Sequence, residues 1–381
     1  MRKYNTAFGM DVHSRSVTVC AVVFETGETE SKKFINCPSP AEIAGWMERF
    51  PAPHYAAYES GCTGFYMARS LRELGIDCDV IATSSIPRTQ KEAKKKSDKL
   101  DAKKLVREIL NSANSLSAVW LPDEETEGAR AISRAHADAV KAMKVAKQQL
   151  LSLLLANGVV YDERTATGTR KKPFTKDFYR WLNTVDLGDA GKTLALGMLK
   201  EAAVDAIERE KRCRAAMLEY ADSERWKPFV DGLSTIKGVG EAGAFAYAAE
   251  IGDFNRFKSA RRLPSWVGLT PSQSDSGEKS SSGKITKAGN AHLRRYLLEG
   301  TNGLVFAANA TTKQTTKNQV VSDLVRAHTK KGTRRLVDRS KHLKTRGKKS
   351  NIIKVAIASE LIKWVWTTGL LIQQEQEAVR S

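Results

Sequence analysis

The sequence has few features of a membrane, secreted or zinc-binding protein. Its 381 residues contain no uninterrupted apolar run of about 18, the length that a membrane span needs. The segment MRKYNTAFGMDVH lacks the apolar core of a signal peptide. The five cysteines form no C-x-x-C pair and the six histidines no H-x-x-x-H pair, which argues against a disulfide framework or a zinc site. We therefore expect a cytoplasmic protein with reduced thiols and no membrane partner.

Acidic residues are also too few to balance the basic ones. The chain has 43 Asp and Glu against 62 Lys and Arg, a formal net charge of +19. Such an excess is typical of proteins that bind a polyanion, most simply DNA or RNA. An anionic membrane surface is the competing polyanion, but the missing apolar run disfavours it. Nucleic-acid binding is the first functional expectation.

The first hundred residues have the pattern of a mixed α/β fold. Short β-branched or buried runs alternate with amphipathic segments, in the order of a layered sheet with helices. The expected strands lie at 5–10, 17–24, 32–35, 55–58 and 79–82, and the expected helices at 40–50, 65–74 and 91–105.

Four acidic residues stand where a metal site would be built. Asp11 ends the first expected strand and Glu59 ends the fourth, while Asp98 and Asp101 lie three residues apart on a helix. Neighbouring strand ends are where α/β sheets place ligands, and Mg²⁺ prefers carboxylate oxygens. A spacing of three puts both aspartates on one helical face. Two plainer interpretations stay open: turn or capping residues, and a solvated, salt-laced helix face.

The helix that carries the two aspartates is crowded with lysine. Ser97 fits the N-cap of this helix. Lysines at this density suit a phosphate backbone. The flanking lysines are Lys91, Lys94, Lys95, Lys96, Lys99, Lys103 and Lys104, of which Lys94, Lys95 and Lys96 are our candidate nucleic-acid contacts.

From Trp120 the composition shifts to long helices. Glu124–Asn157 and Gly191–Tyr220 each predict one long helix, joined by a basic connection at 159–187. The pair suggests an antiparallel helical hairpin or coiled coil. A spacer or dimerisation arm is the plainest role for it.

A glycine-rich turn begins the third region. Gly238 and Gly240 precede an expected helix at 241–251 and would let backbone N–H groups approach a phosphate. An ordinary helix–helix connection explains them equally well. Another helix is expected at 254–267, interrupted at Pro264.

A serine-rich loop and a basic helix start follow at 268–295. Composition alone favours a flexible linker, with Lys284, Lys287, Arg294 and Arg295 as candidate phosphate clamps. The basic stretch 311–349 is expected to be a surface arm that folds only in part without nucleic acid. An apolar helix at 351–371, interrupted by Lys354, closes the chain as a core helix.

Four motifs carry a resemblance to a known family. GMDVH, AYESGCTGF, SDKLDAKKL and GLTP…ITKAGNAHLRR resemble blocks of the DEDD (RuvC-like) insertion-sequence transposase family, which includes the Piv invertases and the bridge-RNA-guided recombinases. The resemblance implies an RNase H-like N-terminal domain in which Asp11, Glu59, Asp98 and Asp101 hold Mg²⁺. It also implies that the serine before glycine, Ser276, is a nucleophile, with Ser274 the next candidate.

The resemblance sets the expected organisation. We expect a RuvC-like domain at 1–115, a coiled-coil arm at 116–225 and a mainly helical transposase domain with the serine at 226–381. The arm would help to assemble a homo-oligomer, a dimer or tetramer, and to hold a guide RNA.

The expected function is recombination of donor and target DNA. Ser276 would form a covalent phosphoserine beside a Mg²⁺-bound acidic cluster, and a bridge RNA would select the sites. Such a bacterial protein would be cytoplasmic and nucleoid-associated when active. The alternatives are a Mg²⁺-dependent junction-resolving nuclease without a covalent intermediate, and a non-enzymatic nucleic-acid-binding protein.

Overall fold

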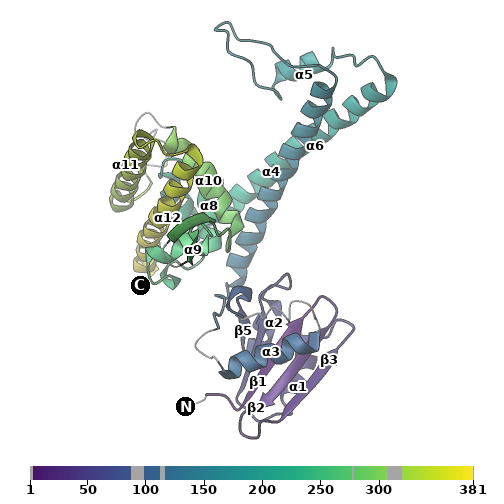
Figure 1. Cartoon of the computed structure of the whole chain (residues 1–381), viewed down its shortest axis with the longest axis vertical. Coiled ribbons are helices and arrows are strands. Elements are labelled where there is room, and N and C mark those ends of the chain that lie inside the picture. The colour runs from purple at the N-terminus through teal and green to yellow at the C-terminus, as the bar shows by residue number, and fades with distance from the viewer. Residues whose placement is uncertain (1–2, 87–97, 112–115, 277–278, 307–319, 381) are drawn as a thin grey trace. The chain divides into compact units, whose positions relative to one another are not determined.

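A computed structural model describes residues 3–86, 98–111, 116–276, 279–306 and 320–380 (Figure 1). Contacts between Cα atoms divide the chain into two compact units, Met1–Pro122 and Asp123–Ser381. The first is a mixed α/β unit and the second is mainly helical, as predicted.

The first unit is built on a five-stranded mixed sheet of order β3-β2-β1-β4-β5. β1 runs antiparallel to β2 and parallel to β4, and β4 runs parallel to β5. The third strand starts earlier than we predicted, because its first residue, Thr29, already pairs with Val22. The strands are β1 (Thr6–Val12), β2 (Val17–Val23), β3 (Thr29–Phe34), β4 (His54–Glu59) and β5 (Asp77–Ile81).

Helices cover both faces of this sheet. Successive strand residues point to opposite faces. Phe8 and Met10 of β1 belong to the apolar core that α1 (Pro40–Met47) and α2 (Tyr66–Glu73) share with the sheet. The opposite face packs against α3 (Asp98–Asn111). α1 ends before the predicted residue 50, since Pro51 disfavours helical residues directly before it.

The predicted helical hairpin is confirmed in the second unit. α4 (Glu124–Ala156) and α6 (Ala190–Ala221) pack along each other (Figure 1). The Tyr220 hydroxyl, near the end of α6, donates to the Glu125 carbonyl at the start of α4 (3.3 Å), so the helices are antiparallel. The connection contains α5 (Lys176–Leu182) and a small aromatic core around Phe178.

The rest of the second unit is a helical bundle with one large apolar core. The expected helix at 254–267 is wrong: this segment forms 3-10 turns at Phe254–Arg256 and Ala260–Arg262 and then α9. Asp253 caps the first turn, and Pro264 favours a new helix start rather than a helix interior. The helices are α7 (Lys227–Ser234), α8 (Glu241–Ile251), α9 (Leu263–Trp266), α10 (Ala291–Val305), α11 (Asp323–Thr345) and α12 (Ser350–Arg380).

The expectation of a partly folded arm at 311–349 is also wrong for 323–345. These residues form α11, which packs against α12 and α10. Val325, Leu336 and Val337 are buried beneath the lysines, and Gly332 lets the helix approach the Trp364 ring. We predicted an arm because the Lys and Arg residues dominate the composition of this stretch, and its few apolar residues were overlooked.

The closing helix α12 is a core helix, as predicted. Among the described residues it is the one helix whose length and composition would allow it to cross a membrane. However, Ile357, Leu361 and Val365 are fully buried in the core of the bundle. Packing explains its apolar character.

One glycine of α12 gives a stability prediction. A Cβ at Gly369 would collide with the Phe254 ring, which stacks on Phe229 with ring centroids 5.2 Å apart. We expect Gly369→Ala to lower the free energy of unfolding by about 1–3 kcal/mol, since a packed core does not accept extra volume. Urea unfolding measures it. Gly197→Ala is the control, because nothing lies within 4 Å of that helical position, and an equal loss in both variants would contradict the packing argument.

Candidate functional site

Asp11 and Glu59 lie side by side at the carboxyl ends of two parallel strands. The register of β1 and β4 pairs Met10 with Tyr58, and the next residue of each strand is the acid. In-register residues of neighbouring strands point to the same face. The Asp11 side chain is 21% exposed, and its Oδ2 lies 3.1 Å from Nε2 of His13. The two carboxylates therefore share one face of the sheet.

That face is the one on which α3 lies. A Cβ built on Gly9, two residues before Asp11, would meet the Ala102 carbonyl oxygen and approach Val106 N to 2.9 Å. The α3 backbone therefore rests directly on the strand at Gly9. On β4, Ala57 packs against Leu105 of α3, and Glu59 is two residues further along the same face.

α3 begins at Asp98, and Asp101 directly precedes Ala102. The strands and the helix thus bring all four predicted acids onto elements that meet on one face. The side chains of Asp98 and Asp101 lie outside the described part of the chain, as do Lys94, Lys95, Lys96 and Ser97. Among the described residues no group of three or more His, Cys, Asp or Glu could hold a metal ion. Asp11 and Glu59 supply the hard oxygen ligands that suit Mg²⁺.

Gly9 is a functional candidate that our sequence analysis missed. Glycine inside a strand weakens it and often marks a close approach of another backbone. The sequence GMD, with glycine two residues before the acid, carried that signal.

Ser276 lies in a β-hairpin rather than in the flexible loop that we expected. β6 (Pro271–Ser276) pairs antiparallel with β7 (Lys279–Ile285), and Ser276 is the last residue of β6, opposite Lys279. The side chains of Ser276 and Ser274 lie outside the described part of the chain. Backbone pairing between the two strands gives this polar stretch the order that its composition did not predict.

The base of this hairpin is closed by backbone hydrogen bonds. Lys287 N donates to the Gly268 carbonyl (3.1 Å) and Asn290 N to the Trp266 carbonyl (3.1 Å). Gly268 and Gly289 both have positive φ, and a side chain at either would strike the opposite backbone. Only glycine fits this crossing without strain.

Arg294 braces the same base. Its Nη1 donates to the Val267 carbonyl (2.9 Å) and the Ala288 carbonyl (3.3 Å), one from each side of the hairpin. The guanidinium that we predicted as a phosphate clamp is therefore engaged with backbone oxygens. Its neighbour Arg295 donates to the Ala137 carbonyl of α4 (3.3 Å).

The other predicted nucleic-acid contacts among the described residues are two lysines of the hairpin region and two glycines before α8. Lys284 and Lys287 are exposed, and Lys287 has a positive φ of 56°. Gly238 packs against the Gly300 carbonyl of α10, so that a side chain there would collide with this backbone. Gly240 is the N-cap of α8 and has open space around it.

A buried acid, Glu250, ties the hairpin to the helical arm. Glu250 of α8 is 2% exposed and accepts two hydrogen bonds from Arg134 of α4, at 2.7 and 3.0 Å. It also accepts one from Asn290 Nδ2 (2.8 Å). Arg130 of α4 donates to the Ala249 and Glu250 carbonyls.

Asn290 in turn caps α10, because its Oδ1 accepts from Leu293 N (2.9 Å). Burial by itself would raise the pKa of Glu250, but the hydrogen bond from Arg134 and the charges of Arg134 and Arg130 outweigh it, so the pKa lies below its ordinary value. Sequence reasoning gave no hint of Glu250, since its partners come from distant parts of the chain.

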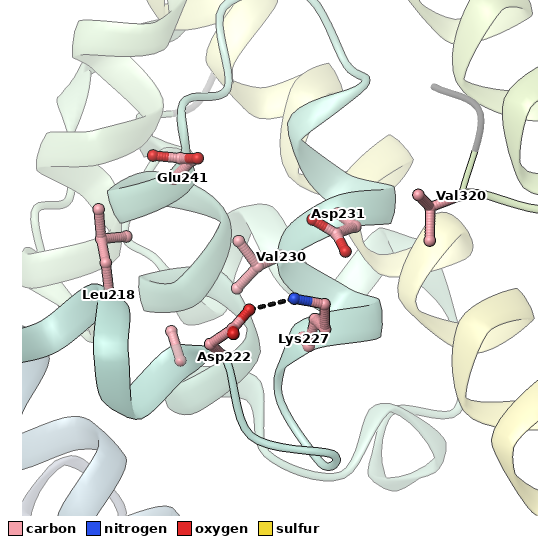
Figure 2. Close-up of a pocket in the computed structure, with 8 residues that line it drawn as sticks. Leu218, Asp222, Lys227, Val230, Asp231, Glu241 and Val320 are labelled. Atoms are coloured by element: carbon pink, nitrogen blue, oxygen red, sulfur yellow. Dashed lines mark hydrogen bonds and ion pairs between the residues drawn. The ribbon is translucent and has the colours of Figure 1, made fainter. Parts of the chain in front are cut away.

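The second unit also has a surface pocket of about 360 Å³ between α6, α7 and α8 (Figure 2). Asp222 and Lys227 form an ion pair across it, and Leu218 and Val230 give it an apolar floor. None of the predicted site residues lines this pocket.

Two family models match ranges of the chain that contain the candidate site residues. A model of the IS116/IS110/IS902 transposase family matches residues 230–317, and a model of the DEDD transposase of IS110 matches residues 8–157. The second range contains Asp11, Glu59, Asp98 and Asp101, and the first contains Ser276.

Individual proteins similar to this chain are also transposases by name. “Putative transposase y4qE” of Sinorhizobium fredii is 31% identical over 312 residues, which cover 82% of this chain and 74% of that protein. The transposase for insertion sequence element IS1533 of Leptospira borgpetersenii is 26% identical over 263 residues, 66% of this chain and 71% of the relative. The transposase for IS1328 of Yersinia enterocolitica is 28% identical over 256 residues, 65% and 70% of the two chains. The chain belongs to the IS116/IS110/IS902 family of transposases.

Proposed function

We propose that this transposase recombines DNA through a covalent phosphoserine formed by Ser276, assisted by Mg²⁺ held by Asp11, Glu59, Asp98 and Asp101. Family membership implies cleavage and rejoining of DNA. The observation that carries the proposal furthest is the shared face of Asp11 and Glu59, with α3 laid against it.

The acidic residues have the chemistry and the placement for a divalent cation. Members of the DEDD transposase family typically use a divalent metal. When bound, Mg²⁺ supplies charge that stabilises the negative charge developing on a phosphate during strand cleavage. Asp11 and Glu59 contribute fixed ligands from adjacent strands, and α3 contributes Asp98 and Asp101.

The serine step conserves a phosphate ester. Ser276 Oγ loses its proton and forms a bond to phosphorus, the bond from phosphorus to one deoxyribose oxygen breaks, and that oxygen takes up a proton. A hydroxyl of a second DNA strand then attacks the same phosphorus and displaces Ser276 Oγ. Because no phosphate ester is lost to water, strands are rejoined without ATP.

Target choice is proposed to lie with a bridge RNA that pairs with donor and target DNA. The net charge of +19 suits a protein that holds nucleic-acid backbones while base pairing reads the sequence. The working form is proposed to be a homo-oligomer, a dimer or tetramer, in which the arm of α4 and α6 joins subunits as a coiled coil. We expect it to act in the bacterial cytoplasm, at the nucleoid.

The test is a trapping experiment. The protein, Mg²⁺, its copurified RNA, and DNA carrying an element end and an insertion site are incubated and then denatured. We expect a DNA–protein adduct that is absent for Ser276→Ala and Asp11→Ala and is lost when the RNA is digested first.

Two serines of the same hairpin are the controls. Ser272→Ala removes a hydroxyl that donates to the Lys284 carbonyl (3.2 Å) and should keep the adduct. Ser274→Ala should also keep the adduct, and loss of the adduct in this variant would make Ser274 the nucleophile instead of Ser276. Free cleaved ends that survive Ser276→Ala but not Asp11→Ala would instead support the second candidate, a metal-dependent nuclease.

A further inference from the structure

The segment that follows the matched family range is the most basic part of the described chain. Residues 323–349 hold eleven Lys and Arg against two Asp. Both family models end before residue 318, so neither accounts for this charge.

Some of these cations have structural partners. Arg335 and Arg339 of α11 both pair with Glu360 of α12, at 3.1 and 2.6 Å, and Glu360 is only 13% exposed. Arg326 pairs with Asp323 (2.6 Å). These three arginines hold α11 in place or close its first turn.

Four other cations have no such partner. Lys330, Lys331, Arg334 and Lys341 are exposed, and within the described residues no hydrogen bond or ion pair joins them to another group. At about 100° per residue, these four side chains lie within an arc of about 100°, on the side of the helix away from the buried Val325 and Leu336 and next to Val337. We call these four residues the α11 basic face. The exposed Arg346 at the C-cap of α11, and Lys348 and Lys349 past Gly347, follow this face in the sequence.

α11 is held in place by contacts with α12 on the side away from these cations. It packs against α12, with Gly332 seated on the Trp364 ring and His328 Nε2 2.8 Å from the Thr367 hydroxyl. Figure 1 shows α11 beside α12 at the outer edge of the helical bundle. A face fixed at so many points is pre-organised, which lowers the entropy cost of binding.

We propose that the α11 basic face binds the phosphate backbone of duplex DNA. Charge complementarity selects a polyanion, and from Lys330 to Lys341 the face extends about 16 Å along the helix, enough to meet several phosphates of one strand. Residues 323–349 include no Phe, Tyr or Trp, so the face lacks the stacking platform that single strands require. Membership of a transposase family makes DNA the polyanion at hand, and in this the proposal rests on the DNA-acting function.

The experiment measures binding of the full chain to a labelled 30-base-pair DNA duplex of arbitrary sequence in EDTA, across a range of NaCl concentrations. The variant Lys330→Gln, Lys331→Gln, Arg334→Gln keeps helix propensity but removes three charges. We expect binding at least 10-fold weaker at 150 mM salt, and a plot of log K against log salt that is shallower by about 2–3, near 0.9 per lost phosphate contact.

The matched control is Lys172→Gln, Lys176→Gln, Lys192→Gln, which removes three exposed charges from the arm region. Unchanged binding by the α11 variant, or an equal loss in the control, would overturn the proposal. The proposal would also be overturned if the three substitutions weakened binding to a structured RNA hairpin of similar length but left binding to the DNA duplex unchanged. Because binding is measured in EDTA, without strand cleavage, failure of the basic face and failure of the serine chemistry are distinguishable. Circular dichroism confirms that α11 variants stay folded.

Discussion

Replacing Glu250 by alanine is expected to lower the free energy of unfolding of the helical unit by about 1–3 kcal/mol, the cost of leaving buried donors without their acceptor. The change leaves Arg134 and Asn290 without their shared acceptor and Arg130 without the carboxylate 3.9 Å from its Nε, in a site where that carboxylate is 2% exposed. Arg130 is 12% exposed, so its charge stays largely buried without a counter-charge, which is costly, whereas Arg134 is 55% exposed and can be solvated. Urea unfolding of the full chain, followed by helical circular dichroism, measures the loss.

Glu250→Gln separates charge from shape. The amide keeps the volume and one acceptor oxygen, so packing is retained while the ion pair is lost. We expect an intermediate destabilisation. Equal stability of wild type, Glu250→Gln and Glu250→Ala would show that the network contributes nothing. The exposed pair of Lys211 and Glu208 supplies a control, because Glu208→Ala should cost no more than about 1 kcal/mol.

The same residue predicts a pH dependence. The folded-state pKa of Glu250 is below its ordinary value, so the unfolded chain takes up the proton at a higher pH than the folded chain. This contribution to stability is complete above the unfolded pKa of about 4.3 and is lost as the pH falls through the folded value. We expect wild type to lose stability more steeply than Glu250→Gln below pH 5, measured by urea unfolding at each pH. Parallel pH profiles would contradict it.

Gly9→Ala is expected to reduce Mg²⁺-dependent DNA cleavage by about 100-fold or more. The new methyl group would meet the Ala102 carbonyl oxygen and Val106, so α3 must move away from the sheet. On our proposed function α3 carries two of the four metal ligands, and a displacement of about 1 Å at a catalytic site can cost 100-fold. Strand cleavage measured against Mg²⁺ concentration should show the loss, with a weaker apparent affinity for the metal.

The control for Gly9 is Gly45→Ala in α1. Nothing lies within 4 Å of a Cβ at Gly45, so this variant should keep both activity and stability. Thermal unfolding of Gly9→Ala in EDTA separates global unfolding from displacement of α3. A folded Gly9→Ala protein with wild-type cleavage and metal dependence would show that the α3 position does not govern the site.

Local patterns were enough to predict the sheet, the helical hairpin and the strand positions of Asp11 and Glu59. Periodicity reports which face of an element is buried, so the positions of strands and helices could be predicted, whereas the strand order could not. The α11 helix was missed because its lysines dominated the composition, although Val325, Leu336 and Val337 recur at helical spacing.

The serine hairpin and the Glu250 network could not be predicted in the same way. The hairpin closes through backbone bonds between 266–270 and 286–290, which leave no periodic signal in a serine-rich text. The network joins Arg134, Glu250 and Asn290, and only the tertiary fold brings such distant residues together. Both missed features are long-range.

Asn290 has a mechanical consequence. Its backbone N–H closes the hairpin, its side-chain oxygen starts α10, and its side-chain nitrogen bonds the carboxylate that Arg134 of the arm also holds. A twist of α4 about its own axis must therefore either break the bonds at Glu250 or drag the root of the hairpin with it. Asn290 and the Glu250 carboxylate therefore couple the position of α4 to that of the β6–β7 hairpin.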